Sequence, residues 1–300
     1  MSRIRLVAHA SWSCAGPRLE SEHAEDAAHP RDLTPALERG DVLFLPRLPF
    51  QVAPQEAGIF SPAILSSGKN ISLDPAVGRM NGTTLGGVER ERLLGVIARF
   101  SDSAQALVDG LFPDYRGRLQ RARASFRPAE IAGRQTSWRK DDTRLHIDSF
   151  PATPVHGRRI LRVFSNVNPS GRPRAWRVGP DFGVVAERFA PELSTPFPWS
   201  AALLRLVRAT KTRRSPYDAL MLQLHDRMKG DGVFQQTCEQ ESVEFPAGST
   251  WVAFTDAVSH AARAGQHQLE QTFLLPVDAM RDEQRSPLRI LERLKGRTLA

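Results

Sequence analysis

Residues 144–150 read Arg-Leu-His-Ile-Asp-Ser-Phe, and this His-x-Asp segment decides how the fold is interpreted. A mononuclear Fe(II) oxygenase needs two imidazoles and one carboxylate on one side of the metal, because the other side must stay open. Alternate side chains of a strand share a face, so His146 and Asp148 would project together while Ile147 packs on the opposite face. We interpret the segment as the end of a strand entering a loop, with two of three metal ligands.

A second His-x-acid pair is present, His23-Ala24-Glu25. About one such pair is expected by chance from 8 His and 33 acidic residues in 300 positions. This pair lies within residues 17–35, a stretch rich in Pro, Glu, His and Asp without periodicity, which predicts a loop. The context therefore favours His146 over His23.

The distal ligand is predicted to be His260. Residues 246–249 (Pro-Ala-Gly-Ser) predict a turn, residues 251–254 predict a strand, and a short loop then presents the histidine. This succession is typical of jelly-roll metalloenzymes. A buried core histidine is the alternative interpretation, and the His-x-Asp partner disfavours it. His156 and His267 lie near the two halves of the motif, but neither has a partner at ligand spacing.

Apolar periodicity organises the rest of the chain. Residues 42–45 predict a strand, 89–111 a helix, and 159–167 a strand followed by a turn at 168–171. Helical spacing returns over 197–229, with one set of apolar positions at Ala201, Leu203, Leu204, Leu206 and Val207 and another at Ala219, Leu220, Leu222 and Leu224. Further strands are predicted at 243–245, 251–254 and 273–275.

These elements predict an α+β, mainly β fold, a double-stranded β-helix (jelly roll) with flanking and inserted helices. We expect a single domain over 1–300, a jelly-roll core at 120–280, a helical insertion at about 185–230 and a basic amphipathic helix at 286–300. Ser286-Pro287 supplies the N-cap and first-turn proline of that last helix.

Composition limits the functional classes. With 41% hydrophobic and 25% charged residues the chain is typical of a soluble globular protein, and neither a bilayer-spanning run nor a signal peptide is recognisable, so a cytoplasmic location is expected. The two cysteines, Cys14 and Cys238, are too few for a disulfide scaffold or a C-x-x-C site. Any metal must therefore be held by His and carboxylates. The net charge of +8 is mostly arginine, which suits an anionic partner or simply a solvated surface.

An enzyme that uses 2-oxoglutarate must also neutralise the far carboxylate of this cosubstrate. About ten positions after the distal His, where a base is usual, the chain has Glu270 and Gln271. Arg162 is the predicted replacement, because an arginine among apolar strand residues is costly unless an anion meets it. The predicted cosubstrate-binding residues are Arg162, Trp176, Gln271 and Asn166.

Four segments resemble the Kdo hydroxylases, and the likeness runs over about 30–276. The segments are Leu145–Pro151, Arg162–Asn168, Gly248–Trp251 and Ser259–Ala262. The resemblance implies an Fe(II)/2-oxoglutarate-dependent dioxygenase with His146, Asp148 and His260 as metal ligands. It further implies that dioxygen and 2-oxoglutarate are used to hydroxylate carbon 3 of the Kdo sugar of Kdo-lipid A, in the inner core of lipopolysaccharide, giving Ko, succinate and CO2.

The basic segment 116–144, with nine basic and three acidic residues, suits a sugar acid on a phosphorylated lipid. The predicted substrate-binding residues are Arg127, Ser125 and Arg144. The resemblance also implies peripheral contact with the cytoplasmic face of the inner membrane, through basic surface and the helix at 286–300. The alternatives are a solvated basic face and a terminal helix packed on the body of the protein.

Two other classes of function stay open. One is a 2-oxoglutarate oxygenase or cupin-type metalloenzyme acting on another anionic small molecule, and strict dependence on 2-oxoglutarate would exclude a cupin-type isomerase. The other is a basic, non-catalytic binder of nucleic acid or anionic lipid, suggested by a pI near 10.2. No nucleic-acid-binding motif is found, and 7% aromatic residues offer little base stacking, so we expect no nucleic-acid partner.

Overall fold

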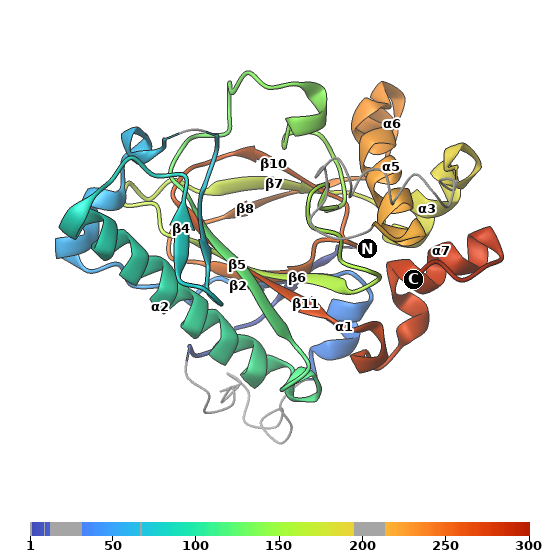
Figure 1. Ribbon diagram of the computed structural model, residues 1–300. Coiled ribbons are helices and arrows are strands. Elements are labelled where there is room, and N and C mark those ends of the chain that lie inside the picture. The colour runs from blue at the N-terminus through green and yellow to red at the C-terminus, as the bar shows by residue number, and fades with distance from the viewer. Residues whose placement is uncertain (1, 9, 13–31, 67, 195–213) are drawn as a thin grey trace.

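The computed structural model describes residues 2–8, 10–12, 32–66, 68–194 and 214–300. Two β-sheets face each other, and helices cover one face and one end of the pair (Figure 1). The strands are β1 (Ile4–Leu6), β2 (Val42–Leu45), β3 (Ile71–Asp74), β4 (Arg79–Asn81), β5 (Gln120–Arg127), β6 (Arg159–Asn166), β7 (Arg174–Val178), β8 (Glu241–Phe245), β9 (Thr250–Phe254), β10 (His260–Ala264) and β11 (Gln268–Leu275). The larger sheet has the order β1-β2-β9-β6-β11-β5-β3-β4 and the smaller β10-β7-β8.

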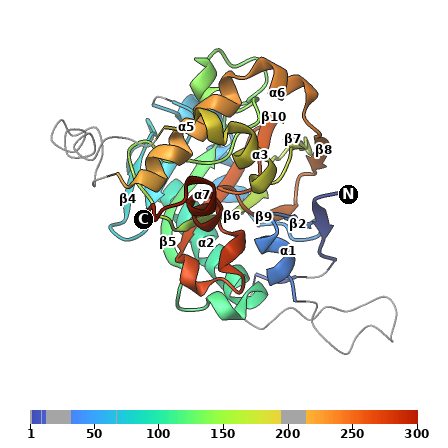
Figure 2. The ribbon, with the colours of Figure 1, turned by 90° about the vertical axis from the view of Figure 1, so that its right-hand side faces the viewer.

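The helices connect and cover these sheets. The α-helices are α1 (Thr34–Glu38), α2 (Gly87–Leu111), α3 (Phe182–Phe189), α5 (Pro216–Gly230), α6 (Gly232–Thr237) and α7 (Pro287–Lys295). The 3-10 helices are η1 (Pro54–Ile59), η2 (Pro62–Ile64), η3 (Pro113–Tyr115), η4 (Trp138–Lys140), η5 (Ala190–Glu192), η6 (Val277–Ala279) and η7 (Glu283–Arg285). Helices α3, α5, α6 and α7 gather at one end of the two sheets (Figures 1 and 2).

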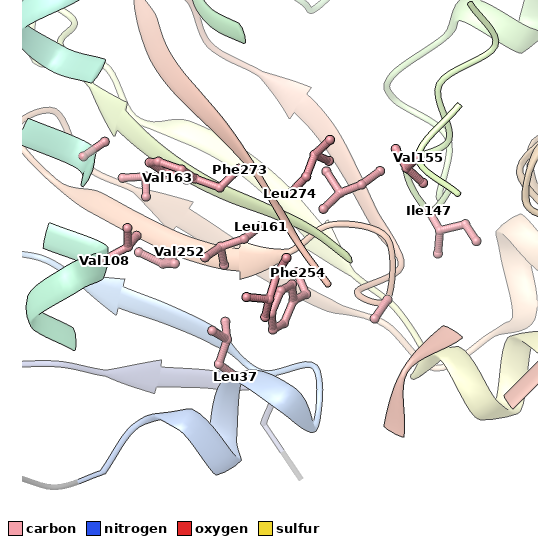
Figure 3. Packing of buried hydrophobic residues seen from close by; sticks show 14 of the residues in the cluster. Leu37, Val108, Ile147, Val155, Leu161, Val163, Val252, Phe254, Phe273 and Leu274 are labelled. Carbon is pink, nitrogen blue, oxygen red and sulfur yellow. The ribbon is translucent and has the colours of Figure 1, made fainter. Parts of the chain in front are cut away.

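The main core lies between α2 and the outer face of the larger sheet. Apolar residues recur along α2 at helical spacing, and those on the sheet side, such as Val96, Phe100 and Val108, are fully buried. Figure 3 shows Val108 close to Val163 and Val252 of the sheet. Burying each such side chain contributes roughly 1.5–3 kcal/mol, so this one-sided packing fixes which face of the sheet points outward.

Strand alternation then places polar residues between the sheets. In β6, Leu161 and Val163 join the main core, whereas Arg162 and Phe164 lie on the other face. The neighbouring β11 pairs with β6 so that Glu270 lies opposite Phe164. The space between the sheets is therefore partly polar, although every residue of both strands is buried.

A second, aromatic core closes one part of the space between the sheets. Phe164 and Trp251 come from the larger sheet, and Trp176 and Phe245 from the smaller one. Phe245 stacks on Trp251 with ring centroids 4.1 Å apart, and Trp176 meets both rings edge-on. This packing holds the two sheets together beside the polar region.

The predicted jelly-roll fold is confirmed, and several strand predictions hold at residue level: β2 covers 42–45, and β6 covers 159–166 of the predicted 159–167. Seven described strands fall within 120–280, and four more, β1–β4, widen the larger sheet at its edges. Helices α3, α5 and α6 lie between β7 and β8 in the chain.

The predicted helical positions 201–207, most of the predicted loop at 17–35, His23 and Cys14 lie outside the described residues. Helix α7 begins as predicted, with the Ser286 hydroxyl accepting from the backbone N–H of Arg289. Its apolar residues Leu288 and Leu291 are buried against the body of the protein. Among the described residues, no helix has the length and apolar character needed to cross a membrane.

Candidate metal centre and its pocket

The segment 144–150 is not the strand end that its sequence predicts. It is extended, and it pairs with β10 through one isolated antiparallel bridge, at His146 and His260. The His146 N–H donates to the His260 carbonyl at 3.0 Å, and the reverse bond is 2.8 Å. Two residues on, the Asp148 N–H donates to the carbonyl of Thr255, which precedes β10, so the pairing with β10 does not continue past His146. Ile147 packs into the main core as predicted.

The side chains of His146, Asp148 and His260 converge. One ligand atom from each lies within 4.8 Å of the others. The His146 Nδ1 lies 2.7 Å from the Arg144 carbonyl and the His260 Nδ1 2.8 Å from the Val258 carbonyl. A carbonyl partner requires a proton on Nδ1, which leaves each Nε2 as a lone-pair donor, the arrangement usual for metal-binding histidines.

The charge states of the three residues suit a divalent cation. Burial is the main cause that lowers the pKa of both His146 and His260, so both rings are neutral at physiological pH. Burial alone would raise the pKa of Asp148, but the Arg162 charge and the two histidines lower it well below its usual value. The buried Asp148 Oδ2 accepts no hydrogen bond from the described residues. Neutral imidazoles and an ionised, partly unsatisfied carboxylate fit an iron site.

A chain of alternating charges, which we call the charge chain, leads away from Asp148. Arg162 Nη1 lies 3.3 Å from Asp148 Oδ2 and 3.6 Å from Glu270 Oε1. Arg127 donates to both oxygens of Glu270, at 2.9 and 3.1 Å. Asp142 then lies 3.6 Å from Arg127 and accepts from Lys69. The charge chain is thus Lys69, Asp142, Arg127, Glu270, Arg162 and Asp148, three cations alternating with three carboxylates.

The three candidate ligands open into a cavity of about 370 Å³. Its walls combine inner-face residues of both sheets with residues of η4 and α5. Positively charged lining residues outnumber the acidic ones. The basic residues are Lys69, Arg127, Arg139, Lys140, Arg162, Arg174 and Lys229, and the acidic residues are Asp142, Asp148 and Glu270.

Of the predicted cosubstrate residues, Arg162 and Trp176 line this cavity. Trp176 stacks on His260 with ring centroids 5.0 Å apart. Gln271 does not reach it, because side chains alternate along β11, and its amide donates to the carbonyls of Ala122 and Thr272. Asn166 lies beyond the cavity, where its amide donates to backbone carbonyls at the end of the strand.

Of the predicted substrate residues, Arg127 lines the cavity, with its guanidinium held by Glu270. Ser125 lies two residues before Arg127 on β5, outside the cavity lining, and its hydroxyl accepts a hydrogen bond from the Asn70 amide. Arg144 donates to the Lys229 carbonyl and lies near Asp141, outside the lining. The structure thus brings one of these three residues to the pocket.

The lining residues that the sequence predictions did not include are more numerous, and among them are Arg174, His225, Lys229 and Glu270. Arg174 shares the face of Trp176 on β7, so strand parity could have found it. Burial lowers the pKa of Arg174 to about 9, and its Nε has no acceptor among the described residues. His225 and Lys229 come from α5, and no local pattern indicates that this helix covers the pocket.

A larger depression of about 800 Å³ lies near β1, β8 and α6. Some of its charged groups already have ion-pair partners, as Arg5 has Asp41 within the lining and Arg188 has Asp231 beside it. Among the described residues, the three-residue cluster of possible metal ligands belongs to the smaller cavity and not to this one.

Fold and site together define the class: a jelly-roll dioxygenase whose pocket carries two histidines and one carboxylate. The sequence profile of the 3-deoxy-D-manno-oct-2-ulosonic acid (Kdo) hydroxylases matches residues 20–298. The chain therefore belongs to the Kdo hydroxylase family, as its resemblance predicts.

Solved structures of the Kdo hydroxylase KdoO, a non-haem Fe(II) α-ketoglutarate-dependent dioxygenase, are similar over nearly the whole chain. The complex with α-ketoglutarate and Fe(III) is 42% identical with a TM-score of 0.91, and the cobalt(II) complex is 43% identical with a TM-score of 0.92. The apo structure is 43% identical with a TM-score of 0.90. Each match covers 99% of this chain and 97% of the other. No curated protein matches the chain.

Proposed function

We propose that this pocket binds Fe(II) and 2-oxoglutarate and hydroxylates carbon 3 of the Kdo sugar of Kdo-lipid A, giving Ko with succinate and CO2. The observation that carries the proposal is the convergence of His146, Asp148 and His260 in a buried, cation-rich cavity. The membership of the Kdo hydroxylase family supports the choice of substrate.

His146, Asp148 and His260 would hold the iron, each histidine through its Nε2. Bound iron supplies the redox chemistry by which dioxygen is divided between cosubstrate and substrate. The protein fixes the ligand geometry through backbone hydrogen bonds, and it lines the cavity with Phe150, Phe164 and Trp176, which limit the access of water.

Arg162 and Arg174 are the proposed anchor for the far carboxylate of 2-oxoglutarate. Three buried donors in this part of the pocket lack an acceptor among the described residues: Arg162 Nε, Arg174 Nε and Trp176 Nε1. Arg162 comes from β6 in the larger sheet, and Arg174 and Trp176 both come from β7 in the smaller sheet. Unsatisfied buried donors cost about 1–3 kcal/mol each, so an anion that accepts from them would be bound strongly.

Peripheral contact with an anionic membrane surface is the proposed way of reaching a lipid-linked substrate. At the cavity rim, η4 carries exposed Arg139 and Lys140 beside Trp138, whose ring lies 4.2 Å below the Arg139 guanidinium. An aromatic ring with flanking bases suits a lipid interface. Helix α7 is a weaker candidate, because Leu288 and Leu291 on its apolar face are already buried.

The test is anaerobic loading with Fe(II), followed by air, 2-oxoglutarate and a Kdo-bearing lipid A precursor, with succinate and lipid mass measured together. One added oxygen per succinate supports the proposal. Succinate without oxygenated lipid would retain the oxygenase class and reject the substrate, and absence of both products would reject the proposed chemistry. Omission of 2-oxoglutarate is the matched control, and it should abolish both products.

A further inference from the structure

Lys229, on α5, is a buried cation without an ion pair among the described residues. The residue is 2% exposed, and its ammonium donates a hydrogen bond to the Arg139 carbonyl at 3.1 Å. Arg162, by contrast, lies at ion-pair distance from Asp148. A buried charge is costly unless an opposite charge meets it, and the carboxylates that favour the charged amine, Asp142 first among them, form no ion pair with it among the described residues, so its ammonium can take a further anion.

The ammonium of Lys229 belongs to the helical side of the pocket. His225 and Lys229 are four residues apart on α5, so they share one face of the helix, and both line the cavity. His225 meets His146 edge-on, with ring centroids 5.5 Å apart, which places this face beside the candidate metal ligands. Arg162 and Arg174 reach the same cavity from the two sheets.

The pocket therefore offers two cationic subsites of different origin. The reaction under the proposed function uses two carboxylate-bearing molecules, 2-oxoglutarate and a sugar acid. The N–H groups of β6 and β7 can donate to one carboxylate, and Lys229 is left for the other. In Kdo the carboxylate is carbon 1 and the deoxy position is carbon 3, so a fixed carboxylate also restricts where carbon 3 can lie.

We infer that the Lys229 ammonium binds the carboxylate of the sugar-acid substrate and thereby selects acidic sugars over neutral ones. The inference rests on the proposed function and deepens it. Burial lowers the pKa of Lys229, and an arriving carboxylate would favour the charged amine again.

The experiment pairs a change in the protein with a change in the ligand. Dissociation constants are measured by calorimetry for the methyl glycoside of Kdo and for its carboxyl methyl ester. The protein is wild type or Lys229→Gln, loaded with cobalt(II) and 2-oxoglutarate so that no turnover occurs. Glutamine keeps a donor for the Arg139 carbonyl but removes the charge. We expect esterification to weaken binding to the wild type about tenfold or more, and to change binding to Lys229→Gln less than about twofold.

Controls separate this role from a structural one. Arg79→Gln removes one positive charge from the exposed surface of β4, outside the cavity lining, and should discriminate acid from ester as the wild type does. The dissociation constant for 2-oxoglutarate should be unchanged in Lys229→Gln. If that variant fails to fold, Lys229→Met and Lys229→Arg replace it, and arginine should restore the preference for the acid.

The inference is overturned if the neutral variant prefers the acid as strongly as the wild type, or if it loses affinity for 2-oxoglutarate instead. A wild type that hydroxylates Kdo-lipid A while binding acid and ester equally would overturn this inference and leave the proposed function standing. A wild type that binds neither sugar and forms no hydroxylated lipid would overturn both.

Discussion

His146 and His260 lie opposite each other in a single antiparallel bridge, and each backbone N–H donates to the carbonyl of the other residue. The separation of the two imidazoles is therefore set by the main chain. Their ring centroids are 4.7 Å apart, and each Nδ1 is held by a further carbonyl. The pair is oriented before any metal arrives, which reduces the conformational entropy lost on binding.

Replacement of a candidate ligand should remove metal binding without unfolding the protein. We expect His146→Ala or Asp148→Ala to lower succinate formation at least about a thousandfold, because two remaining ligands hold iron poorly. Metal content after dialysis and circular dichroism are the measurements. His156→Ala, outside the pocket lining, is the matched control and should retain its iron. Full iron occupancy in Asp148→Ala would contradict the proposed ligand set.

Removal of a proposed cosubstrate anchor should raise the KM for 2-oxoglutarate. We expect Arg162→Ala and Arg174→Met each to raise the KM for 2-oxoglutarate about tenfold to a hundredfold, since a charge-assisted hydrogen bond contributes about 1.5–3 kcal/mol. Initial rates at saturating sugar lipid measure this. An Arg162→Ala protein with a normal KM for 2-oxoglutarate would show that the anchor lies elsewhere, and comparison with Arg174→Met would then locate it.

Glu270 should make stability depend on pH. Burial would raise its pKa, but Arg127 and Arg162 lower it below the usual carboxyl value. The unfolded chain then binds more protons than the folded one, so the contribution of Glu270 is complete above about pH 4.3 and is lost as pH falls through the lowered folded pKa. Glu270→Gln should unfold about 3 kcal/mol more easily in urea at pH 7, and the loss should shrink toward pH 3.

The exposed Glu187 on α3 supplies the control for this series. Glu187→Gln should lie within about 0.5 kcal/mol of the wild type at both pH values. If Glu270→Gln were as stable as the wild type at pH 7, the ion pairs of Glu270 with Arg127 and Arg162 would not stabilise the fold.

The buried Arg159–Asp256 pair should stabilise the turn that leads to His260. Arg159 Nε donates to Asp256 Oδ2 at 2.8 Å, both side chains are fully buried, and the guanidinium lies 3.9 Å over the Phe254 ring. Asp256→Asn leaves a buried arginine without its counter-charge, so we expect a loss of about 3–5 kcal/mol in urea denaturation. Iron affinity of the fraction that remains folded should change little, and a neutral effect on stability would contradict this account.

Sequence patterns predicted the parts of the fold that depend on local periodicity. The strand at residues 42–45 and helix α2 follow from apolar spacing, and the cap of α7 from Ser286-Pro287. Strands β1, β3 and β4 at the edges of the larger sheet were not predicted, because they are short and their pairing depends on distant partners. The sequence predicts a strand end where the structure has the bridge at His146 for a similar reason: a single paired residue has no repeating pattern.

The alternation of side chains along strands predicts only the part of the pocket that strands supply. Arg162 follows from its apolar neighbours on β6, and parity from Trp176 would have indicated Arg174. Lys229 could not be predicted, since a lysine in the last turn of a helix normally faces solvent and interacts with the helix dipole. Its burial arises because α5 packs against η4, a contact between segments about 90 residues apart in sequence.

The charge chain from Lys69 to Asp148 constrains how these positions can evolve. Its three cations and three carboxylates sum to zero, so the loss of any single member leaves an uncompensated charge in the interior. A lineage that replaces Lys69, Asp142, Arg127 or Glu270 should therefore replace a neighbour of opposite sign soon afterwards, so these four positions should change in complementary pairs, whereas Asp148 and Arg162 are held by their proposed roles at the metal and the cosubstrate.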